Sequence, residues 1–310
     1  MASYDIIGDV HGHADKLRGL LTRLGYRDTG GAWRHDERKA IFLGDFVDRG
    51  PKQVETVNIA RRMVDTGSAL AVMGNHEFNA ISWFTPDPEA PGEYLRPHAS
   101  PEDKNRRQHA EFLAEVENKP GLHRELIEWF LTLPLWLDLP ELRVVHACWH
   151  AGHLASLAPK LAPGTRLTPE LLEQGARPRN PEFEALECLT KGVEVALPEG
   201  IRFFDADKNA RTDVRLKWWD ASATTYQNGA HAAREVLDRL PDTALPPGSC
   251  FGYGDPKPLF IGHYWLIGTP TLLAPNVACV DYSAGKGGPL VAYRYSGEPD
   301  LQQENFVASR

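Results

Sequence analysis

The chain has 310 residues, 42% hydrophobic and 25% charged, with a formal net charge of −8. These values are typical of a soluble globular enzyme, and the acidic balance argues against a general nucleic-acid binder, which usually carries a basic face. No apolar stretch approaches the roughly 20 residues that span a bilayer. The start has no basic segment followed by a long apolar one, so a secretory signal is not expected. Four cysteines lie scattered without CxxC spacing, which suits a reducing cytoplasm. We therefore expect a cytoplasmic protein with no membrane partner and no stable nucleic-acid binding.

Apolar runs and helical patterns alternate through the first eighty residues. A β-rich run covers 4–9, and leucine spacing over 13–24 fits one face of a helix. Another strand is expected at 40–43, a helix at 54–64 and a third strand at 69–73. This βαβαβ order predicts an open sheet with helices packed on it. In such sheets, the loops at the carboxyl ends of the strands form the ligand crevice.

The rest of the chain is less regular. Segment 84–105 holds four prolines between 86 and 97, which indicates an irregular insertion, either a surface loop or a flap over the cleft. Further helices are expected at 106–133, 169–175, 181–190 and 222–239, and further strands at 135–139, 144–146, 259–266, 277–285 and 289–296. The pattern predicts an α/β fold, or α+β sandwich, with central mixed sheets flanked by helices. We expect a single domain over 1–310, with 84–140 and 159–250 as insertions or cap segments.

Three short glycine-bounded motifs follow the first three predicted strands: GDVHG at 8–12, GDFVDRG at 44–50 and GNHE at 74–77. Asp9 and His11 lie two residues apart, so their side chains can point the same way. A single Asp or Asn at a strand end is usually a turn former, but three such motifs in order are very unlikely by chance. Oxygen ligands mixed with imidazole suit Mn²⁺, Fe or Zn²⁺, and a shared carboxylate can bridge two ions about 3.5–4 Å apart. The set predicts a dinuclear metal hydrolase acting on phosphate esters.

The unbroken set GDxHG, GDxVDRG and GNHE resembles the calcineurin-like metallophosphoesterases. Within them it is most similar to the phosphoprotein phosphatase branch, as in bacterial serine/threonine phosphatases or diadenosine tetraphosphatases. The resemblance is specific over 4–80, moderate at His146 and His263, and weak across 84–140 and 159–250. It implies two divalent metal ions, Mn most often, with Fe, Zn, Ni or Mg as alternatives. The implied ligands of one ion are Asp9, His11 and Asp45, and those of the other are Asp45, Asn75 and His146, with His263 on either ion and Asp45 as the bridge.

A histidine that directly follows a metal ligand can protonate a leaving alkoxide as general acid. His76 follows Asn75 in this way. It needs an orienting acceptor, for which Asp48 is the candidate, and the resemblance implies the same pair. Arg49 offers a planar fork that matches two phosphate oxygens. Taken singly, Asp48 reads as a capping or salt-bridge residue and Arg49 as a surface charge. The expected reaction is direct attack by a metal-bound hydroxide without a phosphoenzyme, with Arg49, Asn75 and His76 around the phosphate.

The chain departs from the pattern of these phosphatases at the fourth motif. They often carry HGG there, whereas this chain has HACWH at 146–150. A second phosphate-binding arginine is expected beyond it, and Arg202, Arg211 and Arg215 are the candidates. Cys148 is either a redox-sensitive thiol or a small buried neighbour of the site.

Three functions remain open from the sequence. The first is hydrolysis of phosphomonoesters, on a phosphoprotein or a small phosphorylated molecule. The alternative is hydrolysis of dinucleoside tetraphosphates or cyclic nucleotides, and its specificity would lie in the irregular segments. The third is an inactive metal-binding scaffold, which the complete set of expected ligands disfavours. Ranking phosphopeptides and nucleotides by kcat/KM separates the first two, and elemental analysis for metal tests the third.

Overall fold

A computed structural model of the chain describes residues 3–99, 104–204 and 210–309. The chain divides into two compact units, one formed by Met1–Thr190 with Lys257–Arg310 and the other by Lys191–Pro256. The expected insertions at 84–140 and 159–250 include positions 100–103 and 205–209, which lie outside the described residues. The assignment of these segments as insertions into a single domain stays a prediction.

A five-stranded mixed sheet carries the N-terminal motifs. Its strand order is β16-β15-β1-β4-β5, with bounds Phe306–Ala308, Val291–Tyr295, Ser3–Ile7, Arg38–Phe42 and Ala69–Ala71. Strands β1, β4 and β5 run parallel, and β15 pairs antiparallel with β1 and β16. Parallel neighbours need crossover connections, and the helices α1 (Ala14–Leu24) and α2 (Gln53–Asp65) supply them. The predicted βαβαβ order is confirmed.

A second five-stranded sheet has the order β13-β14-β12-β7-β6. The bounds are Leu272–Ala274, Val277–Cys279, Leu259–Ile261, Arg143–Val145 and Trp136–Asp138. Strands β7, β12 and β14 run parallel, while β6 and β13 close the edges in antiparallel pairing. The strands expected at 259–266 and 277–285 are shorter than predicted, because their second halves form loops at the site described below.

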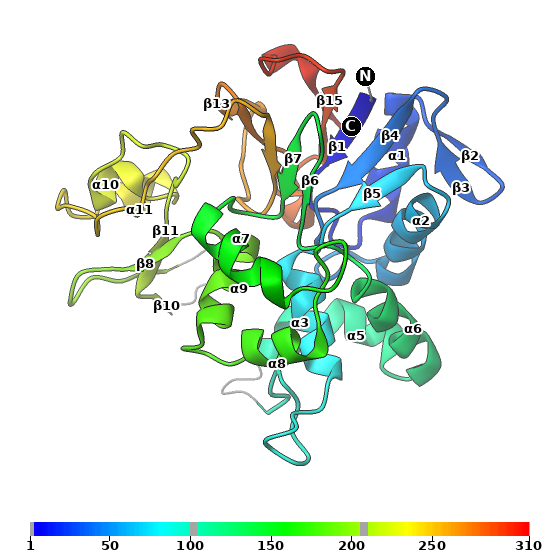
Figure 1. Cartoon of the computed structure of the whole chain (residues 1–310), viewed down its shortest axis with the longest axis horizontal. Coiled ribbons are helices and arrows are strands. Elements are labelled where there is room, and N and C mark those ends of the chain that lie inside the picture. The colour runs from blue at the N-terminus through cyan, green and yellow to red at the C-terminus, as the bar shows by residue number, and fades with distance from the viewer. Residues whose placement is uncertain (1–2, 100–103, 205–209, 310) are drawn as a thin grey trace. The chain divides into compact units, whose positions relative to one another are not determined.

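The two sheets share one core. Ile6 and Ile41 of the first sheet and Val144 and Phe260 of the second belong to one core cluster, and each of the four is 0% exposed. Each such side chain contributes roughly 1.5–3 kcal/mol when it leaves water. Shared burial of this kind makes the pair of sheets a sandwich. In Figure 1 the first sheet includes the blue strands β1 and β4 and the red β15, and the second includes the green strands β6 and β7 and the orange β13. The predicted class, mixed sheets flanked by helices, is confirmed.

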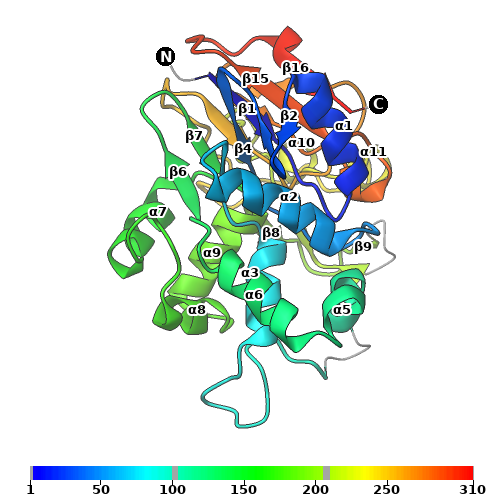
Figure 2. The ribbon, with the colours of Figure 1, turned by 90° about the vertical axis from the view of Figure 1, so that its right-hand side faces the viewer.

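Helices cover the outer face of the first sheet, and α1 shows why. Its leucines at 17, 20, 21 and 24 are buried along one side, as the 3.6-residue period requires. Gly25 ends the helix with φ 94°, a left-handed conformation that glycine adopts without strain. Figure 2 shows α1 and α2 side by side in front of β1 and β4.

The remaining α-helices in the described part of the first unit have 5 to 11 residues. They are α3 (Asn75–Phe84), α4 (Lys104–Gln108), α5 (Ala110–Val116), α6 (Pro120–Phe130), α7 (Ala151–Leu157), α8 (Pro169–Gly175) and α9 (Pro181–Lys191). The expected helix over 106–133 is therefore three helices. Pro120 explains one break, because proline has no N–H to donate and fits the first turn of a new helix. A hairpin of β2 (Arg27–Thr29) and β3 (Ala32–Arg34) was not predicted.

The described part of the second unit holds two short antiparallel strand pairs and two single-turn α-helices. Strand β8 (Glu194–Ala196) pairs with β11 (Asp213–Arg215), and β9 (Phe203–Phe204) with β10 (Ala210–Arg211). The helices are α10 (Tyr226–Gly229) and α11 (Arg234–Leu237). The helix expected over 222–239 is thus wrong. Thr225 and Asn228 form a capping box that starts α10 at 226, and Ala230 is extended, which ends it after one turn.

Candidate metal centre

The five strand ends that carry the expected ligands converge. Asp9, Asp45 and Asn75 follow β1, β4 and β5 at the carboxyl ends of neighbouring parallel strands. His146 and His263 follow β7 and β12 of the second sheet in the same way. The parallel strands of both sheets therefore deliver their polar ends to one place, as expected for this kind of sheet.

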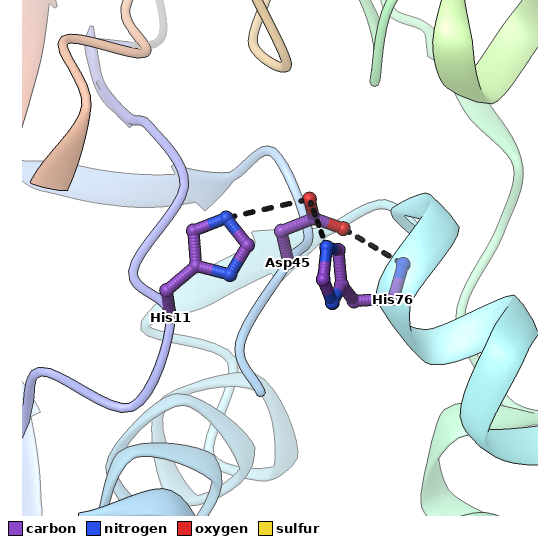
Figure 3. A group of neighbouring side chains, drawn as sticks. All are labelled: His11, Asp45 and His76. Atoms are coloured by element: carbon purple, nitrogen blue, oxygen red, sulfur yellow. Dashed lines mark hydrogen bonds and ion pairs between the residues drawn. The ribbon is translucent and has the colours of Figure 1, made fainter. Parts of the chain in front are cut away.

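Asp45 lies at the centre of the cluster. Its Oδ2 atom is 3.7 Å from Nε2 of His11, 3.4 Å from Nε2 of His146 and 3.9 Å from Nε2 of His76. Figure 3 shows His11 and His76 facing Asp45 from two sides. Two sets of ligand atoms close enough to hold an ion both contain this carboxylate: His11–Asp45–His76 and Asp45–His146–His263. A carboxylate common to two sets is what a bridged pair of ions requires. The first set contains His76, the expected proton donor, and does not contain the expected ligand Asp9.

The orientation of the imidazoles suits metal binding. Nδ1 of His11 lies 3.0 Å from the carbonyl oxygen of Val47, and Nδ1 of His146 lies 2.6 Å from that of Leu43. A ring that donates from Nδ1 presents the lone pair of Nε2 to the site. Nε2 of His11 and Oδ1 of Asp9 are buried acceptors with no hydrogen-bond donor among the described residues. Since buried polar atoms need a partner, these residues fit divalent cations.

The electrostatics of the cluster also indicate a site for divalent cations. Burial raises the pKa of Asp9 well above its ordinary range, and repulsion from Asp281 and Asp45 raises it further. Burial lowers the pKa of His146, but the attraction of Asp45 and Asp9 outweighs it and brings the value to about 10. Burial also lowers the pKa of His11, to about 3. Carboxylates crowded in this way without water need positive charge, which divalent ions supply.

His76 is held by Asp48, as the sequence predicted for a proton donor. Nδ1 of His76 lies 2.5 Å from Oδ2 of Asp48, and its backbone N–H donates to Oδ1 of Asp45 at 3.0 Å. Nε2 of His76 then faces the metal cluster. The other oxygen of Asp48 lies 2.6 Å from Nδ1 of His109, a buried residue that sequence analysis missed. No motif marks His109, because it lies outside the three glycine-bounded segments.

Glu77 is a second residue whose role the sequence analysis missed. Its carboxylate accepts the backbone N–H groups of Asp45 at 2.7 Å, Phe46 at 2.8 Å and Gly74 at 3.0 Å. Burial and the charge of Asp45 raise the pKa of Glu77 to about 7. The side chain thereby ties the second motif to the third. A signal was available, since Glu77 is the last residue of GNHE.

The backbone of the site is strained. Of the nine non-glycine residues with positive φ in the described chain, seven belong to the motifs or the loops beside them: His11, Asp45, Asp48, Arg49, His263, Trp265 and Ser283. Such conformations cost about 1–3 kcal/mol each and cluster at functional sites. Glycines make room where chain segments meet. A Cβ on Gly74 would lie 2.2 Å from Oδ1 of Asp45, and one on Gly262 equally close to Oδ1 of Asp9.

The candidates for a second phosphate-binding arginine all lie in the Lys191–Pro256 unit. Arg211 and Arg215 lie 3.8 and 3.2 Å from the same oxygen of Glu194, and Arg202 is exposed. The second arginine stays a prediction.

Comparison with known proteins assigns the class. The family model of the calcineurin-like phosphoesterases matches residues 3–240. The chain belongs to this family, so the resemblance seen in the motifs is confirmed. Among curated relatives, a bis(5′-nucleosyl)-tetraphosphatase PrpE of Oceanobacillus iheyensis is 30% identical over 149 residues, 48% of this chain and 55% of the relative. One of Bacillus cereus is 40% identical over 156 residues, 48% of this chain and 57% of the relative. The matches thus span little more than half the length of these relatives.

Solved structures agree on the fold. A cold-active protein-tyrosine phosphatase of Shewanella aligns over 100% of this chain and 81% of its own, with a TM-score of 0.51 and 16% identity. A serine/threonine phosphatase of Saccharomyces cerevisiae aligns over 99% and 78%, with a TM-score of 0.51 and 13% identity. At such identities the likeness concerns architecture alone. In the described part of the chain, each helix is too short or too polar to cross a membrane.

Proposed function

We propose that this chain is a dinuclear metal-dependent hydrolase that cleaves phosphate esters or phosphate anhydrides. The observation that carries the proposal is the position of Asp45, whose Oδ2 lies within 3.9 Å of three imidazole nitrogens while His76 is held by Asp48 alongside. The proposed ligands are Asp9, His11, Asp45, Asn75, His146 and His263. The oxygen and imidazole donors favour Mn²⁺, with Fe, Zn²⁺, Ni²⁺ or Mg²⁺ as alternatives.

Three residues act on the substrate in this proposal. When bound, the two ions supply an activated water and neutralise the phosphoryl oxygens. Arg49 directs its guanidinium fork at two of these oxygens, and Asn75 lies beside them. His76 donates a proton from Nε2 to the leaving oxygen, while Asp48 holds Nδ1 and stabilises the charged ring. Burial lowers the pKa of His76, but in the metal-free protein the attraction of Asp45 and Asp48 outweighs it and raises the value.

Two substrate classes have separate support. The relatives named bis(5′-nucleosyl)-tetraphosphatases favour nucleoside polyphosphates. The His76–Asp48 pair favours phosphomonoesters, because an alkoxide leaving group needs a proton far more than a leaving phosphate does. The partner in either case is a phosphorylated molecule. We place the activity in the cytoplasm, which the four free cysteines support.

The test is a substrate panel on metal-loaded protein. The chain is stripped with chelator, reloaded with Mn²⁺ and assayed on p-nitrophenyl phosphate, phosphopeptides, cyclic nucleotides and dinucleoside tetraphosphates. We expect hydrolysis that needs metal and that Asp45→Asn abolishes. A preference above about 100-fold in kcat/KM, nearly 3 kcal/mol of transition-state binding, assigns the class. Metal-loaded protein that hydrolyses none of these compounds contradicts the proposal.

A further inference from the structure

Two cationic side chains lie over the indole of Trp265, which itself stacks on the proposed metal ligand His11. The two stacked rings have centroids 5.1 Å apart and planes 24° apart. The guanidinium carbon of Arg49 lies 5.3 Å from the indole centroid, and Nζ of Lys286 lies 4.7 Å from it. Lys286 is exposed, while Trp265 and Arg49 are partly exposed. The loop of Lys286 also approaches the site closely, since a Cβ on Gly285 would lie 2.9 Å from the ring of His11.

The loop that carries Lys286 is fixed in place. Lys16 of α1 donates hydrogen bonds to the carbonyl oxygens of Ala284 and Gly288, both at 2.8 Å. These two residues flank Lys286 on either side. Charge-assisted bonds are stronger than neutral ones, so two of them from one ammonium group hold the turn firmly against the helix. The Lys286 ammonium is therefore presented from an anchored turn.

A single buried carboxylate joins this loop to that of Trp265. Oδ2 of Asp281 accepts the N–H of Trp265 at 2.7 Å, and Oδ1 accepts the N–H of Ser283 at 2.9 Å. The hydroxyl of Ser283 donates to the carbonyl of Leu266 at 3.0 Å, which adds a direct link. Asp281 is 1% exposed. The spacing between the indole and Lys286 is thus set by hydrogen bonds inside the protein.

We propose that Lys286, which shares the indole of Trp265 with Arg49, binds a second phosphate group next to the phosphate that is cleaved. Both cations lie within 5.3 Å of one indole centroid. A guanidinium and an ammonium are both strong phosphate donors, and at this spacing they can take neighbouring phosphate groups of one ligand. The substrate class that fits is an organic di- or polyphosphate. This inference rests on the proposed function, because the metals and Arg49 take the cleaved phosphate.

The test compares two inorganic ligands on the metal-loaded protein. Calorimetry measures the Kd of orthophosphate and of pyrophosphate, with free Mn²⁺ buffered because pyrophosphate binds the ion. We expect Lys286→Ala to weaken pyrophosphate binding about tenfold, as for one charged hydrogen bond, and orthophosphate binding less than twofold. Lys286→Arg keeps the charge and restores most of the affinity. Lys119→Ala removes an exposed lysine at the start of α6 and is the matched control.

Steady-state kinetics of the same variants provides a second, independent measurement. The ratio of kcat/KM for a dinucleoside polyphosphate to that for p-nitrophenyl phosphate should fall about tenfold in Lys286→Ala. Equal losses for both inorganic ligands, or an unchanged pyrophosphate Kd, overturn the inference. A wild-type protein that hydrolyses nothing but binds pyrophosphate through Lys286 contradicts the proposed function and leaves this binding site standing.

Discussion

Nδ1 of His109 lies 2.6 Å from Oδ1 of Asp48, the carboxylate that holds the proposed proton donor. Both side chains are buried. Burial opposes ionisation of Asp48, but the hydrogen bonds and charges of His109 and His76 keep its pKa well below the ordinary range. One carboxylate is thus fixed between two imidazoles, and its orientation depends on both.

We expect His109→Leu to lower kcat more for poor leaving groups than for good ones. Without His109, Asp48 can rotate and His76 loses its alignment, which matters where the leaving oxygen needs a proton. The expected loss is about tenfold for phenyl phosphate and about twofold for p-nitrophenyl phosphate. His109→Asn keeps an N–H donor near the position of Nδ1 and should recover part of the difference. Equal losses for both substrates would show that His109 serves stability alone.

Gly74→Ala should nearly abolish activity. The added Cβ would lie 2.2 Å from Oδ1 of Asp45 and 2.6 Å from its backbone nitrogen, so the carboxylate that we propose as the bridge must move. Displacements of about 1 Å at a site cost on the order of 100-fold in rate. Mn²⁺ content and kcat should fall together. Gly19→Ala in α1 is the control, since no atom lies within 4 Å of its added Cβ, and it should stabilise the fold by about 0.5–1 kcal/mol.

Glu77→Gln should destabilise the metal-free protein by roughly 2 kcal/mol, because a buried amide cannot accept all three backbone N–H groups that the carboxylate holds. Urea unfolding of chelator-treated protein measures the change. Glu128→Gln alters an exposed glutamate of α6 and should leave stability within about 0.5 kcal/mol. A Glu77→Gln protein as stable as the wild type would show that the three donors find other acceptors.

Cys188 should react as a thiolate near neutral pH. The hydrogen bond from Cys148, and then that with His153, outweigh burial and lower the pKa of Cys188 to about 6. Its alkylation by iodoacetamide should rise with pH through about 6 and level off above about 7. Cys250 has a pKa raised by burial, so its rate should still climb at pH 9. Peptide mass spectrometry follows both residues. In Cys148→Ala the midpoint for Cys188 should move up, and an unchanged midpoint contradicts this account.

The parts of the fold that sequence predicted well are those where local pattern and tertiary packing agree. Helix α1 shows its buried stripe in the spacing of its leucines, and β1 ends at a motif that needs a strand end. The prediction failed where capping and turn residues interrupt a pattern that composition alone suggests. Residues 222–239 have helical composition, but capping by Thr225 and the extended Ala230 break them into single turns. The hairpin of β2 and β3 was overlooked although Gly30 and Gly31, both with positive φ, form a recognisable two-residue turn.

Some residues of the candidate site can be predicted from local sequence patterns, and others cannot. Asp9, Asp45 and Asn75 follow directly from motifs with fixed spacing. His109 and Lys286 approach the site only through folding, from segments about thirty and more than two hundred residues beyond the last N-terminal motif. A single sequence carries no signal for such contacts, because composition and periodicity describe local structure only.

The proposed ligands come from two sheets, and this has a consequence for how members of the family are recognised. The three glycine-bounded motifs, which identify the family at sight, supply one side of the cluster from β1, β4 and β5. His146 and His263 come from strands that start more than sixty residues later. A fragment or a transplanted set of loops that keeps all three motifs therefore lacks two of the proposed metal ligands, even though its sequence still matches the family. We expect a chimera of two relatives to bind metal only when its two sheets bring the proposed ligands to the same positions relative to each other as in the parent proteins.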